Sequence, residues 1–191
     1  VRRGQGRRPV NPPLERASTI LNDDPARLSD PTGGPTYGLE GLTAARASRA
    51  LIADLEEAEQ AFIVPSGLAA VTVPLTALLR PGDEVLTSDA IYGPSRRFLT
   101  RHLAERGVTT RFHPADAGPD AVIAALSPAT RVVLIESPAS LTFEMLDVGA
   151  VARACRARGV YTVMDNTWAT PLYHRSLEQG VDISIQAGTK Y

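Results

Sequence analysis

Lysine is the residue type with the clearest chemical potential here, because the sequence contains only one. Its 20 basic residues comprise 19 arginines and a single lysine, Lys190. An arginine stays charged, whereas a lysine amine can lose its proton and attack a carbonyl carbon to form a Schiff base. A genome-wide preference for arginine would leave the same count. The count alone therefore makes Lys190 a candidate nucleophile and nothing more.

Three further features follow segments that we expect to be strands. Ser66-Gly67 precedes a helical pattern, and the free N–H groups at a helix N-terminus bind phosphate. The alternative for Ser66 is an ordinary helix cap without a ligand. Tyr92 could stack on a flat ligand or be a common loop tyrosine. Asp165 offers a carboxylate upstream of Lys190.

In open α/β sheets, ligands bind beyond the carboxyl ends of the strands. One edge would therefore collect a phosphate-binding turn, an aromatic ring, a carboxylate and the only lysine. Pyridoxal phosphate (PLP) needs these four groups: the lysine bonds its aldehyde, the carboxylate holds a proton on the pyridine nitrogen, the ring stacks, and N–H groups bind the phosphate. The combination predicts a PLP site.

The elements that must position these residues alternate along the chain. Apolar runs predict strands over 61–64, 84–87, 108–112, 131–135, 160–164 and 182–186. Helical spacing of apolar residues predicts helices over 39–60, 67–79, 94–106, 120–126 and 148–158. Strands that are apolar without alternation are buried on both faces, as in parallel sheets. The expected fold class is α/β, a mostly parallel sheet flanked by helices.

Two regions are expected. Residues 1–38 carry clustered arginines and many prolines without periodicity, so we expect an extended or irregular N-terminal arm. Those arginines could contact phosphate or an acidic partner, or be solvated. Residues 39–191 are expected to be the N-terminal part of a larger, truncated domain, because the sequence stops one residue after Lys190 and beside a strand.

Composition excludes several classes of protein. The formal net charge of −1 argues against a nucleic-acid-binding surface. One cysteine, Cys155, permits neither an internal disulfide nor a cysteine zinc cluster. The three histidines, at 102, 113 and 174, lack metal-ligand spacing, so no metal is expected. No apolar run approaches the ~20 residues of a membrane span.

Three motifs carry a family resemblance: Ser137-Pro138, Asp165-Asn166-Thr167-Trp168 and the run from Ser184 to Tyr191. They resemble the Cys/Met-metabolism PLP-dependent enzymes of fold type I, from about Asn11 to the end of the chain. The resemblance implies the large domain of that fold and a cytoplasmic enzyme. It looks most like the members that cleave cystathionine to homocysteine, pyruvate and ammonia in methionine biosynthesis. Cystathionine γ-synthase or γ-lyase activity remains open within the family, and a non-catalytic truncated α/β module remains open outside it.

The resemblance also implies residue roles. Lys190 would bond the cofactor and carry the Cα proton of an amino-acid substrate. Asp165 would pair with the pyridine nitrogen, and Tyr92 would stack on the ring. Ser140 stands where relatives place a residue near the phenolic oxygen of the cofactor.

The phosphate group is expected to be held by several residues. The resemblance assigns this role to Gly67, the Leu68 amide and Thr189. Tyr37 matches a tyrosine that the family lends to a neighbouring subunit, which implies a homo-oligomer with shared sites, by resemblance a tetramer. Two positions depart from the family pattern: Leu39 stands where an arginine is common, and Ala187 where a serine is usual.

Overall fold

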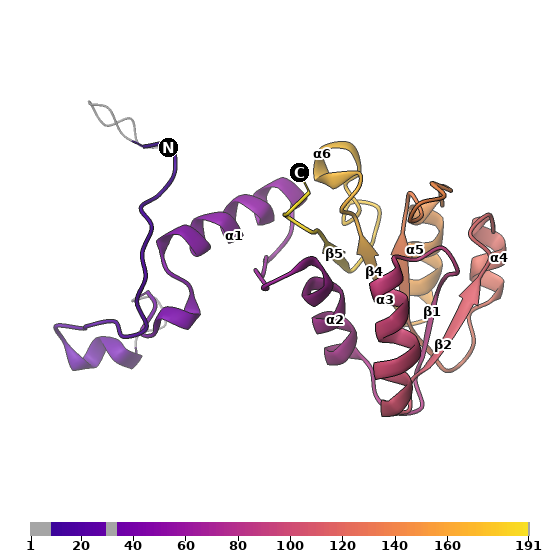
Figure 1. Cartoon of the computed structure of the whole chain (residues 1–191), viewed down its shortest axis with the longest axis horizontal. Coiled ribbons are helices and arrows are strands. Elements are labelled where there is room, and N and C mark those ends of the chain that lie inside the picture. The colour runs from indigo at the N-terminus through magenta and orange to yellow at the C-terminus, as the bar shows by residue number, and fades with distance from the viewer. Residues whose placement is uncertain (1–8, 30–33, 191) are drawn as a thin grey trace. The chain divides into compact units, whose positions relative to one another are not determined.

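The computed structural model describes residues 9–29 and 34–190 (Figure 1). These fall into two compact units. The N-terminal unit contains residues up to Asp54 together with Glu59–Ile63, and the larger unit contains Leu55–Ala58 and the residues from Val64 onward.

The N-terminal unit is largely irregular, with two short 3₁₀ helices that the sequence did not indicate. They are Pro25–Ser29 and Gly38–Glu40, and helix α1 (Thr43–Glu56) follows. Tyr37 forms an isolated bridge with Thr19. A Cβ atom at Gly38 would lie 1.9 Å from the Ala17 carbonyl oxygen, so this crossing of the two segments requires glycine. The arginines at positions 2, 3, 7 and 8 lie outside the described residues.

The larger unit is built on a five-stranded sheet in the order β2-β1-β3-β4-β5. The strands are β1 (Glu84–Ser88), β2 (Thr109–His113), β3 (Thr130–Glu136), β4 (Tyr161–Asp165) and β5 (Ile183–Ile185). All four pairings are parallel. The expected α/β class with a mostly parallel sheet is therefore confirmed.

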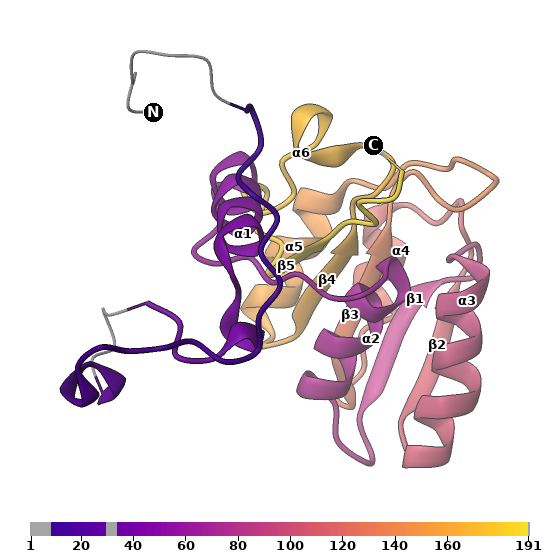
Figure 2. The ribbon, with the colours of Figure 1, turned by 60° about the vertical axis from the view of Figure 1, so that its left-hand side comes forward.

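Helices cover both faces of this sheet (Figure 2). They are α2 (Gly67–Leu78), α3 (Gly93–Arg97), α4 (Pro119–Ala124) and α5 (Val148–Ala157), while the short α6 (Thr170–Tyr173) belongs to the connection between β4 and β5. Helix α3 continues through Phe98–Leu103 and Ala104–Arg106. One core packs α2 and the α3 continuation on the sheet through Leu75 and Leu99, and a second core packs α4 and α5 on the opposite face through Val122 and Val151.

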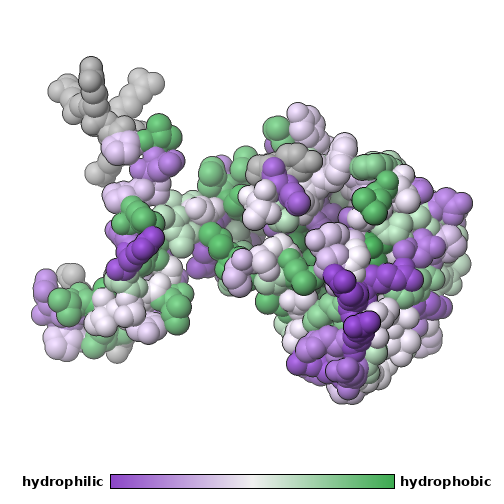
Figure 3. Space-filling model, in the orientation of Figure 1, coloured by the Kyte–Doolittle hydropathy of each residue, from purple (hydrophilic) through white to green (hydrophobic). Residues whose placement is uncertain are grey.

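The outward side of the α3 segment is polar, as the purple side chains over it in Figure 3 show. Arg97, Arg101 and Glu105 are exposed there, whereas Leu99 and Leu103 are buried against the sheet. This division is what an amphipathic helix on a sheet requires. Among the described residues, no helix combines the length and the apolar character needed to cross a membrane.

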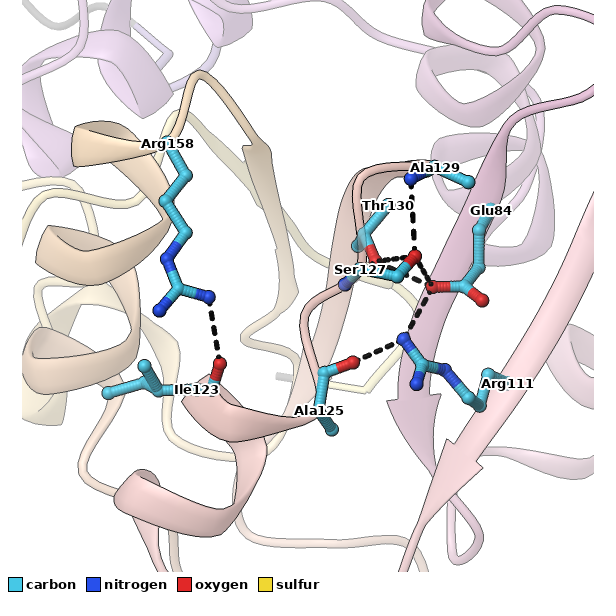
Figure 4. Close-up of polar contacts among 8 residues, drawn as sticks. All are labelled: Glu84, Arg111, Ile123, Ala125, Ser127, Ala129, Thr130 and Arg158. Carbon is cyan, nitrogen blue, oxygen red and sulfur yellow. Dashed lines mark hydrogen bonds and ion pairs between the residues drawn. The ribbon is translucent and has the colours of Figure 1, made fainter.

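One carboxylate joins three of the strands near their amino-terminal halves. Glu84, at the start of β1, accepts hydrogen bonds from Thr130, Ser127 and Arg111 (Figure 4). Burial acts to raise the pKa of Glu84, but these hydrogen bonds outweigh it and lower the pKa below its ordinary value. This network joins β1, β2 and β3 at the edge opposite the strand ends that carry Asp165 and Glu136.

Two expectations about elements were wrong. Residues 61–64 form no strand, because Phe62 and Ile63 are exposed and pair with nothing in the sheet. A short apolar run cannot by itself distinguish a strand from an exposed connection. The helix expected over 39–60 is shorter, since α1 ends at Glu56 and Glu57 adopts a left-handed φ of 51°.

Candidate active site

Two carboxylates end neighbouring strands at the carboxyl edge of the sheet. Glu136 and Asp165 are the last residues of β3 and β4 and are direct partners in the parallel register. They follow the same alternation as Leu134 and Val163, which belong to the core under α2 and α3. Both side chains therefore lie on the α2–α3 face of the sheet.

The environment of Glu136 differs from that of a surface glutamate. Its Oε2 accepts a 2.7 Å hydrogen bond from the backbone N–H of Tyr92. Burial raises the pKa of Glu136 to about 7, and the Asp165 carboxylate adds to the rise while the Tyr92 N–H opposes it. The sequence analysis did not assign Glu136 to the site. In the sequence, only its position at the end of an expected strand pointed to a role in the site. Its pairing with Asp165 depends on the strand register, which the sequence does not reveal.

The Asp165-Asn166-Thr167 run joins the ends of β4 and β5. The Asp165 Oδ1 accepts from the backbone N–H of Thr167 at 3.1 Å. The Asn166 N–H donates to the Ile185 carbonyl at 2.8 Å, and the Thr167 hydroxyl oxygen accepts from the Ala187 N–H at 2.9 Å. Hydrogen bonds of Asn166 and Thr167, the two residues after Asp165, therefore join this run to the segment that leads to Lys190.

The segment after β5 forms a turn that carries the lysine. The backbone N–H of Lys190 donates to the Ala187 carbonyl at 3.0 Å, and the side chains of Thr189 and Lys190 are exposed. The start of α2 lies against this turn. A Cβ atom at Gly67 would lie 2.6 Å from the Cβ of Ala187, so the close approach requires glycine at position 67.

Helix α2 begins as the sequence analysis expected. The Ser66 hydroxyl accepts from the Ala69 N–H at 3.1 Å and caps the helix. The first N–H groups of a helix lack partners within it, and the helix dipole favours an anion there. The N–H groups of Gly67 and Leu68 are therefore at a helix start that can accept an anion, beside the turn that carries Thr189.

Two further candidate residues lie in loops at the same edge. Tyr92 lies between β1 and α3 and is 45% exposed. The N–H of Ser140, in the loop after β3, donates to the Ala90 carbonyl at 3.0 Å and joins the two loops. Tyr37 belongs to the N-terminal unit. Of the eight candidates, seven therefore belong to the larger unit.

The residues at this edge fit PLP. Gly67 leaves the start of α2 without a side chain where the Lys190 turn approaches, so a phosphate can meet backbone N–H groups directly. A carboxylate, an exposed aromatic ring and a lysine accompany it at the ends of parallel strands. This sheet with these groups at its carboxyl edge has the architecture of a fold type I PLP-dependent enzyme.

Comparison with known proteins gives the family. The model of the Cys/Met metabolism PLP-dependent enzymes matches residues 2–191. The chain is 43% identical over 142 residues to L-methionine gamma-lyase from Pseudomonas putida, covering 74% of this chain and 35% of that protein. It is 34% identical over 189 residues to cystathionine beta-lyase MetC from Escherichia coli, covering 95% and 48%.

A solved structure agrees with these relatives. The crystal structure of metB from Corynebacterium glutamicum superposes with a TM-score of 0.88 at 26% identity, over 96% of this chain and 46% of that one. The chain spans less than half the length of each of these relatives. It belongs to the Cys/Met metabolism PLP-dependent enzyme family.

Proposed function

We propose that the complete protein is a PLP-dependent carbon–sulfur β-lyase that cleaves cystathionine to homocysteine, pyruvate and ammonia. The observation that carries the proposal is the connection of Asp165 to the Lys190 segment through Asn166 and Thr167 at one sheet edge. Relatives named cystathionine beta-lyase, at 34% identity over 95–97% of this chain, support the substrate.

PLP supplies an electron acceptor for the negative charge that develops at the substrate Cα. Lys190 would hold the cofactor, and its amine would take the proton from the substrate Cα. Asp165 would pair with the pyridine nitrogen, where a carboxylate would favour the protonated ring. Homocysteine leaves from Cβ, and water completes the release of pyruvate and ammonia.

The remaining candidates bind and orient the cofactor. The N–H groups of Gly67 and Leu68 and the Thr189 hydroxyl hold the phosphate. Tyr92 would stack on the ring, and Ser140 would lie near the phenolic oxygen. Residues 1–38 form an arm whose Tyr37 reaches the phosphate of a neighbouring subunit, and residues 39–191 are the N-terminal part of the PLP-binding domain of a homo-oligomer.

The second candidate is a γ-lyase or γ-synthase of the same family. It is favoured by the 43% identity to L-methionine gamma-lyase and by 36% identity over 140 residues to a cystathionine gamma-synthase relative in Herpetosiphon aurantiacus. The chemistry differs by a second proton removal, at Cβ, which lets the bond at Cγ break. The groups described at this edge serve either reaction.

Product analysis separates the two candidates. The complete gene product, incubated with cystathionine and PLP, should release pyruvate and homocysteine, and a Lys190→Ala variant should release neither. Release of 2-oxobutyrate and cysteine in their place would show γ-elimination. Absence of any product from cystathionine would contradict the proposed substrate.

A further inference from the structure

Glu56 is a buried carboxylate outside the site described above. It is the last residue of α1, and only 4% of its surface is exposed. No other aspartate or glutamate among the described residues is buried to this extent. Taking a carboxylate out of water is costly unless hydrogen bonds replace the lost hydration. A glutamate at this position therefore depends on what it contacts.

The partners of Glu56 lie on the strand that leads to Lys190. Its Oε1 accepts from the Ser184 hydroxyl at 2.7 Å and from the Gln186 side-chain amide. Ser184 is the register partner of Met164, which packs in the core under α5. Glu56 therefore contacts β5 from the face opposite Asp165, and its second donor lies four residues before Lys190.

Glu57, the residue after Glu56, also contacts the segment between β4 and β5. Glu57 adopts a left-handed φ of 51°, which is costly for a residue with a side chain. Its carboxylate forms an ion pair with Arg175 at 2.8 Å. The chain thus turns sharply directly after Glu56 and contacts the segment between β4 and β5.

The segment that follows Asp165 belongs to the same cluster. The Asn166 side-chain amide donates to the His174 carbonyl at 2.8 Å, and the Asn166 N–H donates to Ile185. Burial lowers the pKa of His174, and the nearby Glu56 carboxylate opposes that change. Glu56 therefore lies where the segments carrying Asp165 and Lys190 meet.

We propose that Glu56 is a positioning residue for Lys190. Its two hydrogen bonds hold the Ser184–Gln186 backbone in place from behind the sheet, so the following turn presents the lysine amine in a fixed position beside Asp165. When a site residue is already held in place by a contact outside the site, less conformational entropy is lost as the ligand binds. The inference rests on the proposed function, because it assumes that Lys190 bonds PLP.

The test uses the complete protein with Glu56→Ala and Glu56→Gln, and Glu105→Ala as the exposed control. Amide hydrogen exchange is followed in the cofactor-free form, and PLP release is followed in the loaded form. In the alanine variant, exchange should rise about tenfold in residues 182–190 but not in β1 or β3, since local opening depends on local contacts. PLP release should accelerate by a similar factor. The glutamine variant keeps an acceptor oxygen and should show a smaller change in both.

Several outcomes would overturn the inference. Exchange and PLP release that match the unmodified protein would exclude a positioning role, and a uniform rise across the sheet would show that Glu56 only stabilises the domain. If Glu56→Ala does not fold, the double variant Ser184→Ala/Gln186→Leu removes both donors and must reproduce the local effect. An unmodified protein that binds no PLP at Lys190 would contradict the proposed function, while the exchange data would still report on Glu56.

Discussion

Asp165 and Glu136 are paired in register, yet their surroundings differ. The Asp165 carboxylate accepts from the Thr167 N–H beside the Lys190 turn, whereas burial raises the pKa of Glu136 to about 7. Near neutral pH, the Glu136 carboxyl is therefore partly protonated. The pairing of Asp165 with the pyridine nitrogen of PLP stays a proposal, and the hydrogen bond from Thr167 distinguishes this carboxylate from Glu136.

Replacing Asp165 with alanine should reduce kcat by about a hundredfold or more, because a charge that acts in the transition state is lost. Asp89→Ala is the matched control, since Asp89 is an exposed aspartate that follows β1 at the same edge. Steady-state kinetics of both variants with cystathionine provide the measurement. Equal and mild losses in the two variants would refute the role of Asp165.

The Glu136 pKa predicts a pH dependence of stability in the cofactor-free protein. A folded-state pKa raised from 4.5 to about 7 means that the native state favours the protonated acid. The stabilisation is complete below the ordinary pKa and is lost as the pH rises through about 7. The loss amounts to roughly 3–4 kcal/mol at most, because the change from 4.5 to about 7 contributes about 1.4 kcal/mol per pKa unit.

Glu136→Gln cannot ionise and should not show this loss. Thermal melting of the two proteins from pH 5 to pH 8 should give a midpoint difference that shifts in favour of the variant as the pH rises. Parallel curves across that interval would show that Glu136 titrates normally.

At the scale of elements, the start of α2 lies close to the turn after β5, where we propose that the phosphate of PLP binds. Gly67→Ala should push these segments apart, because its Cβ would lie 2.6 Å from the Ala187 Cβ. Overpacking of this kind typically costs about 1–3 kcal/mol, and we expect weaker PLP binding as well. Gly93→Ala, at the start of α3 with no atom within 4 Å of the added Cβ, is the control. Titration with PLP, together with chemical denaturation, measures both effects, and equal behaviour of the two variants would contradict this geometry.

Sequence reasoning located most elements because their signals are local. Helix termination at Gly107 and Gly159 was readable, and both adopt left-handed φ angles of 79° and 66°. The helix Thr170–Tyr173 was missed because four residues give no periodicity. Residues 61–64 were assigned wrongly because burial depends on neighbours that the sequence does not identify. Glu136 and Glu56 were missed for the same reason. The pairing of Glu136 depends on strand register, and the contacts of Glu56 join segments that are far apart in the sequence.

For the whole molecule, the proposed sharing of Tyr37 between subunits has a direct consequence. Tyr37→Ala and Lys190→Ala chains should each be inactive, and co-refolding them should restore part of the activity, because a mixed dimer can hold one site with both residues intact. Activity after mixing, compared with each variant alone, is the measurement. An inactive Tyr37 variant that recovers nothing on mixing, or a fully active one, would contradict the shared site.

The proposed bond between PLP and Lys190, the single lysine of this chain, can be tested directly. The complete gene product should be incubated with PLP, reduced with borohydride, digested and examined by mass spectrometry. The account predicts a pyridoxyl group on Lys190, on the peptide that contains Thr189-Lys190-Tyr191, and none at this position in a Lys190→Arg variant. A protein that takes up no PLP, or that carries the pyridoxyl group only on a different residue, would contradict it.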